Sequence, residues 1–247
     1  MRHDIPNIYL DMIQQPHLLI AGTTGSGKST ILNALIWTAA HRGPDKVRFL
    51  LIDPKRVNLL KFASLPHTYT HARSQEEILS ALSWARDEVD RRFRWMEDRH
   101  LEDLPGSDLY VCIDELMDIM TSYPKQAKQD IQYIAQVGRA AHVHVIACTQ
   151  SPIREVIPTP IKCNFDARVG LRTRSAQDSR NILGEAGLEQ LPMVGQGVYM
   201  SPRGGMVKYN LPKIPDPVLY ELIEYWHGLP QKRPEKGLKG LLSRLTA

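Results

Sequence analysis

Short apolar runs recur along the 247-residue chain, separated by polar segments rich in turn-forming and charged residues. Most of these runs are four to six residues long and stop at polar or turn residues, as strands buried on both faces of a parallel sheet do. The strands predicted in this way cover residues 17–21, 47–52, 109–113, 143–147 and 167–171. Residues 198–200 and 206–209 predict a closing hairpin around a Pro- and Gly-containing turn.

Helical patterns fill the intervals between the predicted strands. Residues 31–36 and 125–140 indicate helices, and a long helix is expected to begin near Ser74, which forms a capping-box pattern with Glu77. Its apolar positions recur at steps of three and four, and pairs such as Glu88 with Arg92 are assigned to its solvated side. This alternation predicts an α/β fold with a mostly parallel central sheet flanked by helices.

The loop after the first predicted strand carries the phosphate-binding pattern Gly-x4-Gly-Lys-Ser. A strand, a glycine loop and a helix N-terminus together aim backbone N–H groups at phosphate oxygens, whereas a chance Gly-rich turn would lack the flanking elements. Lys28 is expected to reach the β- and γ-phosphates of ATP, and Ser29 to ligate Mg²⁺. The predicted nucleotide-binding residues are Gly22, Thr23, Thr24, Gly25, Ser26, Gly27, Lys28, Ser29 and Thr30.

Two further strand ends supply polar groups that suit ATP hydrolysis. The strand at 109–113 ends in Asp114, a candidate ligand in the magnesium shell opposite Ser29, and Glu115, a candidate for orienting the attacking water. The strand at 143–147 leads to Gln150. In P-loop ATPases of the additional-strand type, a polar residue at this place faces the γ-phosphate, so Gln150 is a candidate sensor, with a simple strand-end hydrogen bond as the alternative.

Composition narrows the protein class further. The chain is 43% hydrophobic and carries a formal net charge of +4, and it has no apolar stretch near the roughly 20 residues that span a bilayer. The N-terminus also lacks a signal-peptide pattern, so we expect a cytoplasmic protein without a membrane segment. Residues 228–247 carry five basic residues against one acidic residue. Such a local basic excess suits a polyanionic partner or, less specifically, a solvated surface.

Taken together, these motifs resemble the motor domain of the FtsK/SpoIIIE DNA translocases over residues 9–209. Besides residues 16–29, the matching segments are Ile52-Asp53-Pro54-Lys55, Asp114-Glu115, Arg139-Ala140-Ala141, Ala147-Cys148-Thr149-Gln150 and Asp178-Ser179-Arg180. The resemblance implies a RecA-like P-loop domain that forms a hexameric ring around double-stranded DNA and binds ATP between subunits. Arg139 matches the arginine that the family inserts into its neighbour's site, and Arg180 is a second candidate for trans or DNA-facing work. Either could instead be an ordinary surface arginine.

The chain departs from the family pattern at two places. Ser151 stands where an arginine of the DNA-facing loop is common, and Ala176 replaces a lysine expected two residues before Asp178. The nearby arginines 154, 172 and 174 are candidates for the missing phosphate contacts, so the predicted DNA-binding set is Arg154, Arg172, Arg174 and Arg180.

The domain organisation expected from these matches is simple. Residues 1–227 form the motor domain, and residues 228–247 form a basic, poorly ordered tail. The resemblance begins within about ten residues of Met1, and the tail is too short for the winged helix that family members often carry. We therefore expect a compact relative that lacks the membrane and winged-helix parts.

The function expected from the sequence is ATP-driven translocation of double-stranded DNA. Lys28, Glu115, Gln150 and Arg139 are the expected catalytic residues, and ATP and Mg²⁺ the expected cofactors. Two alternatives stay open. One is a secretion-type FtsK-like ATPase that acts on protein, and the other is a nucleotide-binding accessory subunit that hydrolyses poorly.

Overall fold

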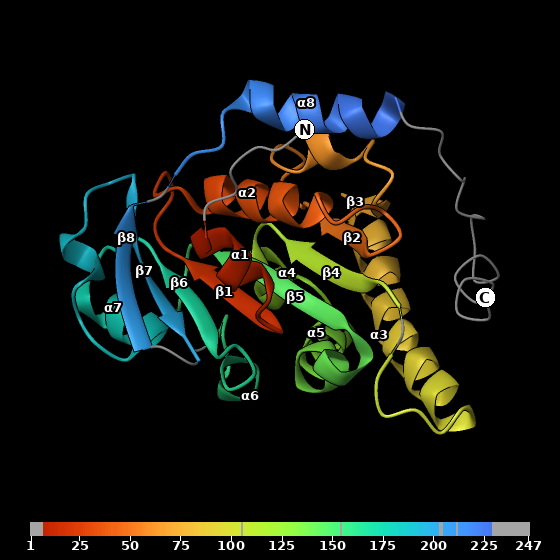
Figure 1. The fold of residues 1–247 in the computed structure, drawn as a ribbon. Helices are drawn as coiled ribbons and strands as arrows, with labels where there is room; N and C mark the ends of the chain where they lie inside the picture. The colour runs from red at the N-terminus through yellow and green to blue at the C-terminus, as the bar shows by residue number, and fades with distance from the viewer. Residues whose placement is uncertain (1–6, 105, 154, 203–204, 211, 229–247) are drawn as a thin grey trace.

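The computed structural model describes residues 7–104, 106–153, 155–202, 205–210 and 212–228. In this part of the chain, one eight-stranded sheet has the strand order β3-β2-β4-β5-β1-β6-β7-β8 (Figure 1). The strands are β1 (His17–Ala21), β2 (Val47–Ile52), β3 (Thr68–Ala72), β4 (Asp108–Ile113), β5 (Val143–Thr149), β6 (Ala167–Gly170), β7 (Gln196–Ser201) and β8 (Gly205–Asn210).

Strand pairing confirms the mostly parallel sheet. All pairs from β3 to β6 in the strand order are parallel, and the two antiparallel pairs are β6–β7 and β7–β8, the second of which is a hairpin at one edge. β5 lies between β1, which precedes the phosphate loop, and β4, which precedes Asp114. This is the additional-strand arrangement expected from the sequence. Because the five adjacent parallel pairs share one direction, their carboxyl ends meet at one edge of the sheet.

Helices cover both faces of the sheet (Figure 1). In the described chain they are α1 (Asn7–Ile13), α2 (Lys28–Ala40), α3 (Gln75–Asp98), α4 (Leu116–Ser122), α5 (Lys125–Val137), α6 (Thr159–Lys162), α7 (Ala176–Leu183) and α8 (Asp216–Gly228). Short 3₁₀ turns are η1 (Leu60–Phe62), η2 (Gly138–Ala141) and η3 (Leu188–Gln190).

Alternation along the strands divides the buried side chains between two cores. Leu18 and Ile20 of β1 pack into the core under α1, α2 and α8, whereas Leu19 joins the opposite core under α3, α4 and α5. Both faces of the central strands are therefore apolar, and every residue of β1 and β2 is buried. This explains why these strands, apart from His17 and Arg48, read as hydrophobic runs in the sequence.

The long helix α3 begins as the capping pattern predicts, but one of its charge pairs was misplaced. The Ser74 hydroxyl accepts a hydrogen bond from the Glu77 amide at 3.2 Å, and the Glu77 carboxylate accepts one from the Ser74 amide at 2.9 Å. Glu88 and Arg92 do pair, at 2.7 Å, but both are buried rather than solvated. The Arg92 guanidinium also donates to the carbonyls of Ala141 and His142, so it fastens α3 to the start of β5.

Several elements were not predicted from the sequence, namely β3 and the helices α1, α4, α6, α7 and α8. β3 pairs with β2 at the sheet edge, and α8 packs Leu219, Leu222 and Ile223 onto the core beside α2. α8 runs through Gly228, while residues 229–247, where the basic tail was expected, lie outside the described residues.

Candidate nucleotide site

The phosphate loop adopts a conformation that its glycines make accessible. Gly25 and Gly27 have φ of 79° and 105°, the left-handed region that residues with a β-carbon rarely enter. At Gly22 the limit is contact rather than conformation, because an added Cβ would lie 2.7 Å from the Cβ of Leu171. Gly27 is the N-cap residue of α2, and because glycine has no side chain that could accept a hydrogen bond, the first N–H groups of that helix have no side-chain cap. An anion at this helix start would meet unsatisfied donors.

The ends of the neighbouring strands hold the loop in place. The Gly22 amide donates to the Thr149 carbonyl at the end of β5, at 3.2 Å, and the Thr23 amide donates to the Arg172 carbonyl after β6, at 2.8 Å. Inside the loop, the Ser26 hydroxyl donates to the Thr23 carbonyl at 2.7 Å. The loop is therefore tied to both strands that flank β1.

The Lys28 ammonium group is folded against the loop. Its Nζ donates to the carbonyls of Gly22 and Thr23, at 2.9 and 2.8 Å. Burial lowers the pKa of Lys28, with the carboxylates of Glu115 and Asp114 acting in the opposite direction. The ammonium thus lies at the centre of the loop, where a phosphate oxygen would replace neutral carbonyls with a charged acceptor.

The residues expected to hold magnesium lie together. The Ser29 hydroxyl is 3.5 Å from Oδ1 of Asp114, and the amide group of Asn58 donates to Oδ2 of the same carboxylate at 2.9 Å. Burial raises the pKa of Asp114, while the Asn58 hydrogen bond lowers it. A hydroxyl and a carboxylate are hard oxygen ligands of the kind Mg²⁺ prefers, so this donor pair fits the ion.

Glu115 is buried, at 1% exposure, and its carboxylate contacts three donors. Oε1 accepts from the amides of Met117 and Gln150, at 3.3 and 3.2 Å. Oε2 accepts from the Lys55 ammonium at 3.0 Å. Lys55 and Asn58 were given no role from the sequence. They follow β2, and the parallel β2–β4 register, which aligns Ile52 with Ile113, brings them beside Asp114 and Glu115.

Gln150 connects the end of β5 to the loop. Its side-chain oxygen accepts a hydrogen bond from the Thr24 hydroxyl at 2.7 Å. It also lines a cavity of about 470 Å³ with Lys28, Ser29, Asp114 and Glu115. Thr24, Gly25, Gly27 and Thr30 line the same cavity, so the structure brings most of the predicted site together. Gly22 and Thr23 instead line a smaller adjoining hollow.

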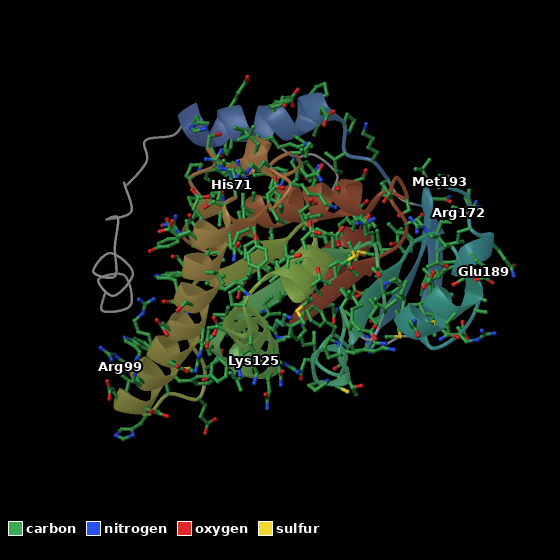
Figure 2. The ribbon with its side chains drawn as sticks, turned by 180° about the vertical axis from the view of Figure 1, so that it is seen from behind. His71, Arg99, Lys125, Arg172, Glu189 and Met193 are labelled. Atoms are coloured by element: carbon green, nitrogen blue, oxygen red, sulfur yellow. The ribbon has the colours of Figure 1, made fainter. Side chains whose placement is uncertain are left out.

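Exposed apolar side chains lie next to this cavity and were also missed in the sequence. Val57 and Val194 line it and are 72% and 60% exposed. Met193, labelled in Figure 2, lies over the loop, since a Cβ at Gly25 would be 3.6 Å from its Cε. The sequence marks Met193 and Val194 only as two apolar residues just before Gly195.

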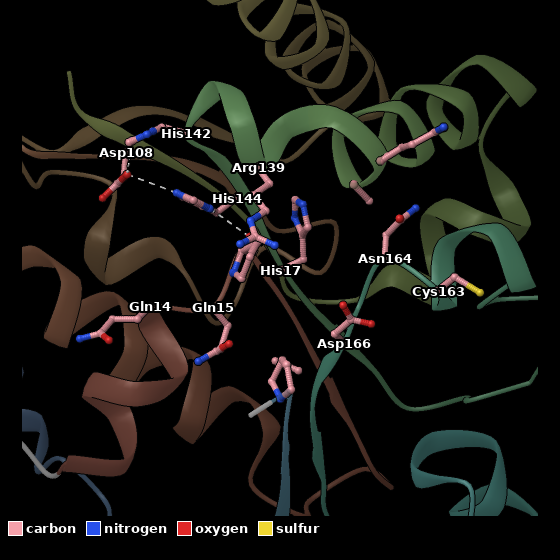
Figure 3. A pocket seen from close by; sticks show the side chains of 15 residues that line it. Gln14, Gln15, His17, Asp108, Arg139, His142, His144, Cys163, Asn164 and Asp166 are labelled. Atoms are coloured by element: carbon pink, nitrogen blue, oxygen red, sulfur yellow. Dashed lines mark hydrogen bonds and ion pairs between the residues drawn. The ribbon is translucent and has the colours of Figure 1, made fainter. Parts of the chain in front are cut away.

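Arg139 lies away from this cavity. It is in η2, just before β5, whereas Gln150 follows β5, and a seven-residue strand rises roughly 20 Å. Arg139 is exposed and lines a separate cavity of about 570 Å³, beside His17 and His144 (Figure 3). His142 and His144 both contact Oδ1 of Asp108, at 3.1 and 3.3 Å. The guanidinium is therefore placed at the sheet edge opposite the phosphate loop.

The predicted DNA-binding arginines differ in their surroundings. The Arg172 guanidinium donates to the Leu191 carbonyl at 3.0 Å and so helps to hold the segment before β7 (Figure 2). Arg174 is exposed beside the hollow formed with Gly22 and Thr23, and Arg180 is exposed on α7. Arg154 lies outside the described residues.

Comparison with known proteins agrees with this geometry. Residues 4–108 match the model of the FtsK/SpoIIIE family. The chain is 31% identical over 259 residues to the DNA translocase FtsK of Rickettsia bellii, covering 87% of this chain and 35% of the relative. It is 35% identical over 212 residues to the DNA translocase FtsK of Borreliella burgdorferi, covering 79% and 27%. The chain thus spans about a third of the length of these curated relatives.

Solved structures confirm the fold. The cytoplasmic domain of the Thermomonospora curvata type VII secretion ATPase EccC superposes with a TM-score of 0.77 at 23% identity, covering 90% of this chain and 29% of that one. The pCW3 conjugation coupling protein TcpA, in its monomer form with ATPγS, gives 0.75 at 21% identity, covering 87% and 66%. Within the described residues, no helix has the length and apolarity needed to cross a membrane.

The family match, the relatives and the shared fold confirm the resemblance that the motifs indicated. The chain belongs to the FtsK/SpoIIIE family and has the fold and phosphate loop of a P-loop ATPase.

Proposed function

We propose that this chain hydrolyses ATP at the interfaces of a six-membered ring, the size that the family resemblance implies, and uses the energy to move double-stranded DNA. One observation carries the proposal. The cradle, the carboxylates and Gln150 share one cavity, whereas Arg139 lies at the opposite edge of the sheet. One edge of the sheet therefore carries the nucleotide cavity, and the opposite edge carries the arginine. If neighbouring copies in a ring contact each other through these two edges, the arginine of one copy would complete the nucleotide site of the next.

In this scheme the residues of one cavity bind and orient the triphosphate. Loop amides and Lys28 hold the phosphates, and Ser29 and Asp114 hold magnesium, which supplies neutralising charge at the β- and γ-phosphates when bound. Glu115 orients the attacking water, since its carboxylate is fixed by two backbone amides. Gln150, hydrogen-bonded to Thr24, is positioned to register whether the γ-phosphate is present.

The DNA contacts are assigned to exposed arginines near the carboxyl edge of the sheet. Arg174 and Arg180 are both exposed, and Arg174 borders the hollow beside the loop. Arg172 is a weaker candidate than its sequence position suggested, because its guanidinium is bonded to the Leu191 carbonyl. The DNA translocases among its relatives support this partner for the chain.

The test of the proposal is ATP turnover with and without long duplex DNA, combined with displacement of a triplex-forming strand. We expect duplex DNA to raise turnover by about tenfold, since coupling between sites is commonly of that order. The triplex strand should be displaced only while ATP is hydrolysed. Turnover that responds to a protein partner and not to DNA would contradict the proposal and favour a secretion-type or accessory role.

Replacing Arg139 by alanine is expected to lower turnover by about 10³-fold or more, because such an arginine neutralises charge at the transferring phosphoryl group. Loss alone would not show action in trans. An equal mixture of the Arg139→Ala and Lys28→Ala chains should therefore recover roughly a quarter of the parent rate, since random rings pair an intact cradle with an intact arginine at that frequency.

Arg99→Ala offers a matched control for the mixing experiment. Arg99 caps the distant end of α3 and stacks over Trp95, with its Cζ 4.4 Å from the ring centroid (Figure 2). Its substitution should leave turnover unchanged. If the mixture stays as inactive as either variant alone, Arg139 does not complete a neighbour's site.

A further inference from the structure

Lys55 lies between the buried carboxylate of Glu115 and the nucleotide cavity. Its ammonium is 3.0 Å from Oε2 of Glu115, and the two side chains are 41% and 2% exposed. Lys55 belongs to the Ile52-Asp53-Pro54-Lys55 segment, whose function the assignments above leave open. The ion pair therefore joins a buried carboxylate to the ammonium of a partly exposed lysine side chain.

The two partners differ in how firmly they are held. Glu115 caps α4 and accepts hydrogen bonds from the Met117 and Gln150 amides, so its position is set by the backbone. Glu115 is also the only hydrogen-bond acceptor of the Lys55 ammonium in the described structure. Because its stem has four rotatable carbons, Lys55 can exchange acceptors at small cost.

The cavity offers Lys55 a second acceptor when a triphosphate is bound. Lys55 lines the same cavity as Lys28, Ser29 and Gln150, where the γ-phosphate is expected. A γ-phosphate carries more negative charge than a single carboxylate, so it is the stronger charge-assisted acceptor for an ammonium. ADP would leave this part of the cavity without an anion, and Lys55 would stay on Glu115.

We propose that Lys55 is a positioning residue that holds Glu115 in an ion pair until a γ-phosphate arrives. The Lys55 side chain then moves, and its ammonium pairs with that phosphate instead of with Glu115. The transfer frees Oε2 of Glu115 to orient water only when ATP is present. No bond is made or broken in this step. The inference rests on the proposed ATP site and adds a residue that distinguishes ATP from ADP.

A double-mutant cycle on nucleotide affinity tests the transfer without relying on turnover. The dissociation constants of ATPγS and ADP, each with Mg²⁺, are measured by calorimetry for the parent, Lys55→Met, Glu115→Gln and the double variant. Lys55→Met should weaken ATPγS binding about tenfold and leave ADP within about twofold. Glu115→Gln frees the lysine, so it should tighten ATPγS binding about threefold, but only where Lys55 is present.

Two further variants keep the result interpretable. Lys55→Arg keeps the charge and should restore most of the preference for ATPγS over ADP. Lys61→Ala removes a lysine that pairs with Asp216 at 3.6 Å and does not line the cavity, so both constants should be unchanged. Thermal unfolding of each variant checks that the fold is intact.

Two results would overturn the proposal. In the first, Lys55→Met weakens ATPγS and ADP equally, which would make the ion pair merely structural. In the second, the effects of Lys55→Met and Glu115→Gln on ATPγS are additive. Failure of the parent chain to bind either nucleotide would contradict the proposed function itself and is thereby distinguished from both.

Discussion

Alanine at position 28 is expected to abolish measurable nucleotide binding, the largest effect of any single substitution in the site. The Lys28 ammonium is the cation at the centre of the loop, and it already contacts the carbonyls of Gly22 and Thr23. Removing a partly buried charge that faces several phosphate oxygens should weaken ATP binding by at least about hundredfold. Titration with a fluorescent ATP analogue would measure the loss.

A lysine remote from the loop provides the control for this substitution. Lys125 is exposed at the start of α5 (Figure 2), and Lys125→Ala should bind nucleotide as the parent does. Thermal unfolding should show Lys28→Ala folded, because the loop keeps its hydrogen bonds to the Thr149 and Arg172 carbonyls. ATP binding by Lys28→Ala at the parent affinity would show that this loop is not the nucleotide site.

Glu115→Gln should separate binding from chemistry. The amide oxygen can still accept hydrogen bonds from the Met117 and Gln150 amides, so the geometry of the loop should persist. What is lost is the carboxylate that polarises water, and such general-base contributions amount to about 10²–10⁴-fold in rate. We therefore expect ATP to remain bound while its single-turnover hydrolysis falls by about that factor.

The control here is a glutamate of the same size outside the site. Glu76 is exposed in the first turn of α3, and Glu76→Gln should turn over ATP at the parent rate. Hydrolysis by Glu115→Gln at the parent rate would remove Glu115 from the mechanism. Loss of ATP binding in this variant would assign the residue to the cradle instead.

The central part of the fold could be predicted because its signals are local. β1 and β2 are buried along their whole length, and apart from His17 and Arg48 the sequence shows this as apolar runs. β3 gave no such signal, since as an edge strand it keeps residues such as Tyr69 largely exposed. Glu88 and Arg92 were misplaced because spacing alone cannot show that a charged pair is covered by the start of β5.

The site was predictable to the same extent. The loop, Asp114, Glu115 and Gln150 are each marked by a residue pattern next to an apolar strand. Lys55 and Asn58 are not, because their role depends on contacts with residues about 60 positions away in the chain. Only the pairing of β2 with β4 creates these contacts. The location of Arg139 likewise required the direction of β5.

β5 lies between η2, which carries Arg139, and Gln150, which follows the strand directly. The strand is hydrogen-bonded on both sides, to β1 and to β4, and this leaves little room for independent bending. In the proposed ring, a shift at one end would be passed on to the other almost undiminished. ATP hydrolysis at one interface would then influence hydrolysis at the next, and the rigidity of β5 would determine the order of hydrolysis around the ring.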